Sequence, residues 1–265
     1  MDISAEHLAE YRETAKQAAI EGGRILLKWM GKANVCEKNP GDLVTEADYE
    51  SQKTIRNFLL AKFPGHEFLG EENDGSLTEL NSEGFCWIVD PLDGTINYVH
   101  QLRSFSVSVA LAYQGKIIAG AVVDPVLDEC YSAALHQGAH LNDVPIRTSE
   151  CTEVDKSLLV CSLPSRAHPD APDVKRFLEV MHRAGSIRRL GSAALNFCYV
   201  ACGRLDAYWA TSINIWDVAA GVLILSEAGG WITHIDGAEF DLRNPKFLAS
   251  ANSELHRNLM PLMKT

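Results

Sequence analysis

The sequence predicts a layered fold of the α/β or α+β class, in which helices and strands are mixed along the chain. Two observations favour this class. Apolar residues change several times between helical spacing and short strand-like runs. Strand-like runs also follow one another as hairpins in both halves, which a simple strand–helix–strand series would not produce. The chain has 265 residues, 46% of them hydrophobic, so it can bury a large core. We expect one domain, 1–265, with approximate halves 1–150 and 151–265.

The first half is expected to contain two helices and then a series of strands. Apolar residues at helical spacing predict a long helix from Ser4 to about Lys32. Thr45 is a good N-cap and Asp48 follows three residues later, so a capping-box-like pattern predicts a second helix through about Phe63. Strand-like runs follow at 68–72, 87–89, 105–113, 116–123, 129–135 and 138–146, with hairpin turns at 114–115 and 124–128.

The second half is expected to start near Lys156 and to alternate strands with helices. Strand-like runs lie at 158–162 and 206–210. Helical patterns lie at 173–184, 191–203 and 219–228. The remaining segment, 231–265, is expected to form strands and a last helix.

Composition argues against several classes of protein. Seven scattered cysteines without a CxxC pair disfavour a disulfide framework or a zinc site. A formal net charge of −11 disfavours nucleic acid or an anionic membrane as a general partner, but it permits a small phosphorylated ligand. The G-x-G-x-x-G and P-loop patterns are absent from the sequence. An acidic N-terminus and the lack of an apolar stretch of membrane-spanning length predict a cytoplasmic protein.

Two acids follow the apolar run at 87–89. Asp90 and Asp93 are costly to bury unless a cation lies between them, and Mg²⁺ prefers such oxygen ligands. Gly94 and Thr95 would then open a helical turn whose free N–H groups can bind phosphate. The alternative is an ordinary Asp-Pro turn. The segment 124–128 also follows an apolar run, but it spaces its acids differently and is predicted to be such a turn.

Other candidate residues also allow a structural interpretation. Glu71 is one of two adjacent acids after a strand, where acids are often only solvated. Asp48 could simply cap its helix, and Asp217 could simply stabilise the first turn of a buried helix. The small residues Gly191, Ser192 and Ala193 open a helix in a way that suits an anion, although tight packing explains them equally well.

Taken together, these segments resemble the inositol monophosphatase family. The motifs that carry the resemblance run through nearly the whole chain: DLVTEAD at 42–48, GEE at 70–72, WIVDPLDGT at 87–95, WDVAAG at 216–221 and EAGG at 227–230. The resemblance implies a layered αβαβα sandwich shared with fructose bisphosphatases, a homodimer, and Mg²⁺-dependent, lithium-sensitive hydrolysis of a small phosphate monoester. The first half would bind the metal and the second would complete the site.

The resemblance also implies roles for individual residues. One Mg²⁺ would be bound by Glu71, Asp90 and the carbonyl of Leu92. A second would be held by Asp90, Asp93 and Asp217, and Glu71 would help to hold a weaker third. The attacking water would be oriented or deprotonated by Glu71, Thr95 and Asp48. The substrate would be contacted by Asp93, Gly94, Thr95, Gly191, Ser192, Ala193 and Asp217, with its phosphate at Gly94 and Thr95.

Substrate choice is more open than the chemistry. Related enzymes commonly carry a substrate-contacting Glu where this chain has Ala210, which should loosen the preference for one polyol. Lys38 stands near the place of a basic residue that faces the phosphate. Inositol monophosphate is the leading substrate; histidinol phosphate, fructose bisphosphate and a nucleotide 3′-phosphate are alternatives. A regulatory binding protein that keeps the fold is the alternative from another class.

Overall fold

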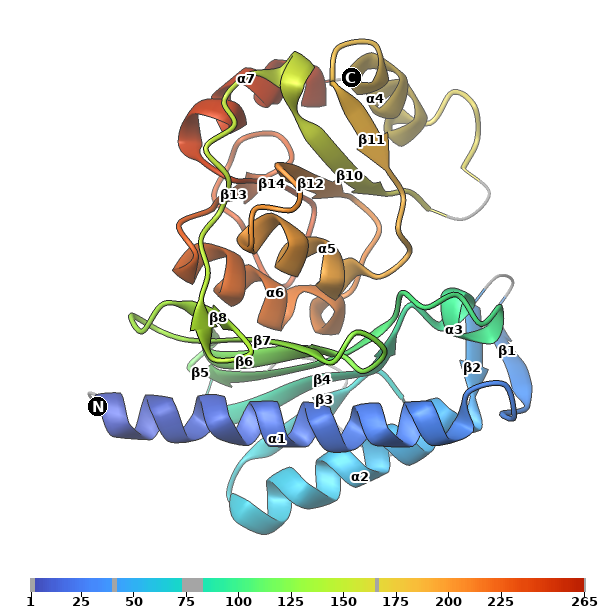
Figure 1. Ribbon diagram of the computed structural model, residues 1–265, viewed down its shortest axis with the longest axis vertical. Helices are drawn as coiled ribbons and strands as arrows, with labels where there is room; N and C mark the ends of the chain where they lie inside the picture. The colour runs from blue at the N-terminus through green and yellow to red at the C-terminus, as the bar shows by residue number, and fades with distance from the viewer. Residues whose placement is uncertain (1–2, 40–41, 73–82, 165–166, 265) are drawn as a thin grey trace.

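The structure, a computed structural model, describes residues 3–39, 42–72, 83–164 and 167–264. Helices and sheets are stacked in five layers (Figure 1). The layers hold, in order, α1 (Ala5–Trp29) with α2 (Glu46–Lys62), a seven-stranded sheet, α5 (Ala193–Ala201) with α6 (Ile215–Glu227), a five-stranded sheet, and α4 (Pro172–Met181) with α7 (Ser253–Met263). The expected αβαβα sandwich is therefore confirmed. Along the described part of the chain, no helix is both long and apolar enough to cross a membrane.

The seven-stranded sheet is built entirely from the first half. Its order is β3-β4-β5-β6-β7-β8-β9, and only the β3–β4 pair is parallel. The strands are β3 (Glu67–Gly70), β4 (Phe85–Asp93), β5 (Ser106–Tyr113), β6 (Lys116–Asp124), β7 (Glu129–Ala134), β8 (Ala139–Leu141) and β9 (Val144–Pro145). A separate antiparallel pair, β1 (Val35–Asn39) and β2 (Asp42–Thr45), precedes α2, and the short α3 (Thr95–Val99) follows β4.

The five-stranded sheet belongs to the second half and has the order β11-β10-β12-β14-β13. Its strands are β10 (Leu158–Ser162), β11 (Ser186–Arg188), β12 (Ala207–Ala210), β13 (Trp231–His234) and β14 (Phe247–Ser250). A single 3₁₀ turn, η1 (Val154–Lys156), precedes β10. Because β10 runs parallel to both β11 and β12, the C-terminal ends of these three strands share one edge of the sheet.

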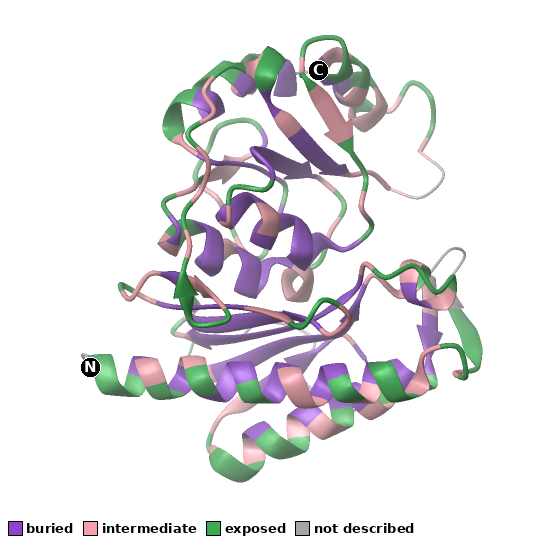
Figure 2. Cartoon of the chain, viewed as in Figure 1, coloured by how far each residue is buried: buried purple, intermediate pink, exposed green. Residues whose placement is uncertain are grey.

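Each sheet is covered on both faces, so three apolar clusters form between the layers. Along β4, Trp87 and Val89 pack toward α1 and α2, while Cys86 and Ile88 pack toward α5 and α6. This alternation is the two-residue period of a strand. A third cluster packs α4 and α7 against the far face of the five-stranded sheet. Figure 2 shows the resulting pattern, with the sheets and central helices buried and the outer helices exposed on one side.

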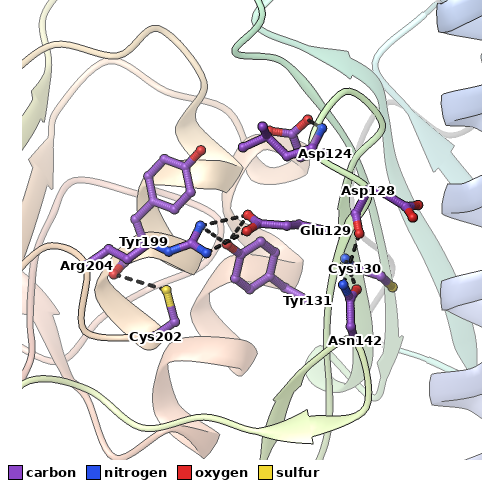
Figure 3. A network of polar contacts seen from close by, with 10 residues as sticks. Asp124, Asp128, Glu129, Cys130, Tyr131, Asn142, Tyr199, Cys202 and Arg204 are labelled. Atoms are coloured by element: carbon purple, nitrogen blue, oxygen red, sulfur yellow. Dashed lines mark hydrogen bonds and ion pairs between the residues drawn. The ribbon is translucent and has the colours of Figure 1, made fainter.

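The two halves are also joined by a polar contact away from the strand ends. Arg204, which follows α5, forms a two-pronged ion pair with Glu129 of β7, with distances of 2.7 and 2.5 Å (Figure 3). The hydroxyl of Tyr131 accepts from Arg204 at 2.9 Å and donates to Glu129 at 2.7 Å. A bidentate guanidinium–carboxylate pair fixes orientation as well as distance. This contact therefore sets how the second half sits on the first.

Most predicted elements are confirmed, with small shifts at their ends. The expected turn at 114–115 joins β5 to β6, with φ values of +50° and +75°, and 124–128 joins β6 to β7 as predicted. The capping box of Thr45 and Asp48 at the start of α2 is present. The helix expected at 219–228 begins earlier, at Ile215, so Asp217 lies inside its first turn. The strand β1 was not predicted.

One prediction for the central stretch is wrong. We expected the strand to end at Val89, with Pro91 turning the chain, but β4 continues through Asp93. Asp90 pairs with Ser108 and Asp93 pairs with Ser106, so three steps on β4 match two on β5. This is a β-bulge, and a bulge tolerates proline because the ladder is interrupted there. The strand β3 pairs only with 86–89, so Pro91 has no second partner to satisfy.

The contact between α5 and α6 yields a prediction about stability. A Cβ atom added at Gly221 would lie 2.6 Å from the Cβ of the fully buried Phe197. We expect Gly221→Ala to lower the free energy of unfolding by about 1–3 kcal/mol, because the packed core cannot absorb the methyl group without moving. Urea unfolding followed by circular dichroism measures this. The matched control is Gly65→Ala, where no atom lies within 4 Å. Equal stability of the two variants would contradict the prediction.

Candidate active site

The bulge in β4 places two carboxylates on the same face of the sheet. Residues three apart on a regular strand point to opposite faces, but the extra residue between Asp90 and Asp93 cancels that alternation. Their partners Ser106 and Ser108 are two residues apart on β5 and share the face toward α5 and α6. The hydroxyl of Ser106 donates to Asp93 at 3.1 Å, which agrees with this orientation.

A third carboxylate arrives from the second half. Asp217 is in the first turn of α6, where one of its oxygens accepts from the backbone N–H of Asn214 at 2.7 Å. Carboxyl oxygens of Asp90, Asp93 and Asp217 lie within 4.8 Å of one another. Asp217 therefore both caps its helix and joins the acid cluster, so the two interpretations of this residue are compatible.

Burial makes this cluster electrostatically unfavourable without a cation. Burial, followed by the neighbouring charges of Glu71, Asp93 and Asp217, raises the pKa of Asp90 well above its usual range. Burial and the charge of Asp93 raise the pKa of Asp217 to about 7. Asp90 and Asp217 lie close enough to share a proton. A bound cation would favour the charged forms that the protein alone disfavours.

Asp93 is the most heavily hydrogen-bonded of the three acids. Backbone N–H groups of Ala193 and Ala194 donate to its two oxygens at 2.9 and 2.8 Å, and the hydroxyl of Ser192 donates as well. These donors form the N-terminal turn of α5. Burial raises the pKa of Asp93, and these hydrogen bonds partly offset the effect. The carboxylate therefore ties the metal-facing strand of the first half to a helix of the second.

Gly94 and Thr95 form the turn that follows the cluster. Gly94 has φ of +96° and is the N-cap of α3. A Cβ atom there would lie 3.2 Å from the carbonyl oxygens of Gly191 and Ser104, so both conformation and space require glycine. The hydroxyl of Thr95 donates to the carbonyl of Leu92 at 3.1 Å. The helical turn expected to begin at these residues is thus present.

Glu71 and Leu92 lie beside the cluster. Glu71 directly follows β3 and is half-buried, and after burial its charge is the largest cause of the raised pKa of Asp90. Its carboxylate is not among those whose oxygens lie within 4.8 Å of one another. The backbone N–H of Leu92 donates to Asp90 at 3.0 Å, while its side chain packs into the core beneath α1 and α2. Of the groups of Leu92, only the backbone carbonyl is thus a candidate metal ligand.

Asp48 is buried at the start of α2. One of its oxygens accepts from the backbone N–H of Thr45 at 2.9 Å and from the hydroxyl of Thr45 at 2.6 Å. Its charge, together with burial as the larger cause, raises the pKa of Tyr98. Because Tyr98 is on α3, Asp48 lies near the helix that begins with Thr95. Its capping role is therefore established by geometry, and a role beside Thr95 is compatible with it.

A cavity of about 560 Å³ opens beside the acid cluster. This volume lies in the range of small-molecule sites. Its walls include Asp93, Gly94, Thr95, Gly191, Ala193 and Asp217 from the predicted site, and also Leu43, Ile96, Asn97, Ser162, Leu163, Arg189, Leu190, Ser212 and Ile213. Ser192 is fully buried and bonded to Asp93, so it supports the wall from behind. Lys38 is in β1, and nothing further is described of its side chain.

At the position in β12 where the resemblance suggested a carboxylate, the chain has Ala210, which is not part of the cavity wall. Ala210 is fully buried and belongs to the core cluster between the sheets. It pairs in register with Ser162, whose hydroxyl hydrogen-bonds to that of Tyr208 at 2.8 Å. The described cavity wall therefore has no acid other than Asp93 and Asp217.

Three residues of the site, two of them on the cavity wall, were missed in the sequence. The side-chain amide of Asn97 donates to the carbonyls of Ser104 and Leu190, both at 2.7 Å, and so joins α3 to the segment before α5. Ser106 bonds to Asp93 across the bulge. Arg189 lies on the wall next to β11. The sequence held a weak signal for Asn97, which lies two residues after the WIVDPLDGT motif, and for Arg189, which is in the basic segment before Gly191.

The donor set fits a hard divalent cation. The clustered side chains offer only carboxylate oxygens, which suit Mg²⁺ and do not suit metals that prefer sulfur or imidazole. Burial is the largest cause of their raised pKa values, and neighbouring acids add to it, so a bound cation would offset the repulsion. Fold and site together define a protein in which an acid cluster able to hold a cation lies beside a cavity of small-molecule size.

Comparison with known proteins identifies the family. The sequence profile of the inositol monophosphatase family matches residues 7–265. The inositol-1-monophosphatase of Mesorhizobium japonicum is 38% identical over 253 residues, covering 94% of both chains. The crystal structure of the extragenic suppressor protein suhB from Bartonella henselae superposes with a TM-score of 0.89 at 35% identity, covering 96% of this chain and 98% of that one. An inositol monophosphatase structure from Anabaena gives a TM-score of 0.86 at 35% identity, covering 97% and 96%. The chain belongs to the inositol monophosphatase family, as its motifs predicted.

The acid cluster yields a prediction about pH and metal. Because burial raises the pKa of Asp217 to about 7, the metal-free folded state holds a proton that the unfolded state has already lost. Its free energy of unfolding should therefore fall between pH 5 and 8, by on the order of 2 kcal/mol or more. Saturating Mg²⁺ at pH 8 should restore a similar amount. Urea titrations with EDTA or MgCl₂ measure both effects.

Two variants test whether the Mg²⁺ response comes from this cluster. Asp217→Asn should reduce the stabilisation by Mg²⁺. Asp124→Asn should retain it, because Asp124 is a fully buried acid outside the cluster, whose oxygen accepts from the backbone N–H groups of Val126 and Leu127 within the β6–β7 turn. An identical Mg²⁺ response in wild type and Asp217→Asn would contradict the assignment.

Proposed function

We propose that this protein hydrolyses a small phosphate monoester with Mg²⁺, and that inositol monophosphate is the leading substrate. The observation that carries the proposal is the convergence of Asp90, Asp93 and Asp217 at the wall of a cavity of small-molecule size. Family membership and the names of the relatives support the same activity. Lithium sensitivity is typical of the family, so we expect Li⁺ to slow the reaction.

The proposed metal ligands come from both halves. Glu71, Asp90 and the Leu92 carbonyl would hold one Mg²⁺, and Asp90, Asp93 and Asp217 a second, with Glu71 contributing to a third. When bound, Mg²⁺ lowers the pKa of water and stabilises charge on the departing oxygen. Because the ligands span residues 71 to 217, we propose that 1–265 works as a single catalytic domain. Its two approximate halves, 1–150 and 151–265, would act as one unit.

The remaining residues are proposed to position the water and the ester. Glu71, Thr95 and Asp48 would orient or deprotonate the attacking water. The hydroxyl of Thr95 can rotate away from the Leu92 carbonyl, or it can keep that bond and accept a second hydrogen bond on its own oxygen, since a hydroxyl both donates and accepts. Gly94 and Thr95 would contact the phosphate. The wall at Gly191 and Ala193, supported by Ser192, would contact the alcohol.

The alternative substrates remain within the same chemistry. Histidinol phosphate, fructose bisphosphate and a nucleotide 3′-phosphate all present a phosphate monoester to the same acids. A regulatory binding protein is the alternative of another class, and it would require neither Mg²⁺ binding nor turnover. We also propose a cytoplasmic homodimer without nucleic acid or membrane as partner. Light scattering should then give about twice the chain mass of 29.1 kDa.

A direct test is phosphate release from inositol 1-phosphate. Purified protein should release phosphate only when Mg²⁺ is present. Asp93→Asn should lower kcat/KM by on the order of 10²-fold or more, because it removes a charged metal ligand and one of the two oxygens that accept from the α5 turn. The control Asp124→Asn should retain activity within a few-fold. Undiminished turnover by Asp93→Asn would refute the metal assignment. No hydrolysis across a panel of phosphate esters, with no heat on Mg²⁺ titration, would favour the binding protein.

A further inference from the structure

The cavity beside the acid cluster has two ends of opposite charge. One end is lined by Asp93 and Asp217. The other end belongs to the five-stranded sheet and is lined by Ser162, Arg189 and Ser212. Among the described wall residues, Arg189 is the only basic side chain. Mg²⁺ would neutralise the acidic end, but nothing in the proposed chemistry uses the charge at the other end.

Strand topology explains why Arg189 faces this cavity. The strands β10, β11 and β12 are mutually parallel, so their C-terminal ends open at the same edge. Ser162 ends β10, Arg189 directly follows β11, and Ser212 lies two residues beyond β12. Ligands of α/β proteins commonly bind at such an edge. Arg189 is therefore placed by the fold at the edge of the five-stranded sheet, whereas Asp93 reaches the cavity from the seven-stranded sheet.

Arg189 is exposed, and its guanidinium has a hydrogen-bond partner but no ion-pair partner among the described residues. One of its terminal nitrogens donates to the carbonyl of Leu163 at 3.0 Å. Ion pairs among the described residues engage other arginines, such as Arg176 with Asp173, and do not include Arg189. A guanidinium has five N–H donors and no acceptor, so several donors remain for a ligand. Its planar fork matches phosphate and carboxylate oxygens.

Accepting the hydrolysis proposed above, we propose that the preferred substrate carries a second anionic group, a phosphate or a carboxylate, at the end of its alcohol remote from the scissile phosphate. Arg189 binds that group, and Ser162 and Ser212 can donate hydrogen bonds beside it. Because Ala210 replaces the carboxylate that the resemblance suggested, the described wall has no acid beyond Asp93 and Asp217 to repel an anion. The net charge of −11 gives no general attraction for anions, so the preference depends on this local cation.

Matched esters separate the effect of the second anion from that of the alcohol. The first pair is fructose 1-phosphate and fructose 1,6-bisphosphate, which tests a second phosphate. The second pair is glucitol 6-phosphate and 6-phosphogluconate, which tests a carboxylate on the same six-carbon chain. The readouts are kcat and KM for each ester with saturating Mg²⁺. Wild type should prefer the anionic member of at least one pair, and the pair identifies the group.

Three variants locate the preference. Arg189→Met should lower kcat/KM for the preferred anionic ester about tenfold, mainly through KM, because a charge-assisted hydrogen bond is lost. For the ester of the same pair that lacks the second anionic group, kcat/KM should stay within about twofold of the wild-type value, which also shows that the variant folds. Arg189→Lys should restore part of the loss. The matched control is Arg188→Met: Arg188 is an adjacent exposed arginine that bonds to Ser186 and Ile187 and is not part of the cavity wall.

The possible failures are distinguishable. If Arg189→Met lowered kcat/KM equally for esters with and without the second anionic group, the inference would be overturned and the phosphatase proposal would stand. The same would follow if wild type preferred, in both pairs, the ester without the second anionic group. An equal loss of the anionic preference in Arg188→Met would show general surface charge and would also overturn it. Absence of Mg²⁺-dependent hydrolysis of every ester by wild type would defeat the proposed function itself.

Discussion

Mutual repulsion of buried carboxylates is the constraint on which the rest of this structure depends. Asp90, Asp93 and Asp217 are held within 4.8 Å of one another, the first two buried and the third half-buried at the cavity wall, and the fold must keep them there. Two devices do so. The bulge in β4 turns Asp90 and Asp93 to one face, and the first turn of α6 carries Asp217 to the same place. A cation then converts an unfavourable cluster into a binding site.

The same site also joins the two halves of the chain. Asp93 accepts hydrogen bonds from the first turn of α5, and Asn97 bonds to the carbonyl of Leu190 from the other side of the cavity. Farther away, Glu129 and Arg204 form a second junction between the sheet and the loop after α5 (Figure 3). Polar contacts at both places orient layers that hydrophobic packing alone would leave free to slide, because apolar burial has no directional preference.

Local patterns made much of the fold predictable. Hairpin turns at 114–115 and 124–128, and the capping box at Thr45 and Asp48, depend on neighbouring residues and were recognised in the sequence. The length of β4 was not, because Pro91 normally ends a strand and a bulge is defined by its partner strand. The candidate acids could be named from their motifs. Ser106, Asn97 and Arg189 could not, since their importance comes from residues 13 to 93 positions away or from strand ends that meet only in three dimensions.

The bulge has a consequence for how this segment can vary. Between Asp90 and Asp93, three residue steps on β4 match two on β5, and this mismatch alone decides which side of the sheet each acid faces. Loss or gain of one residue there would send a carboxylate toward α1 and α2 while leaving the composition almost unchanged. Segment length is therefore constrained more tightly than the identity of the two intervening residues, and relatives should tolerate replacement there more readily than insertion.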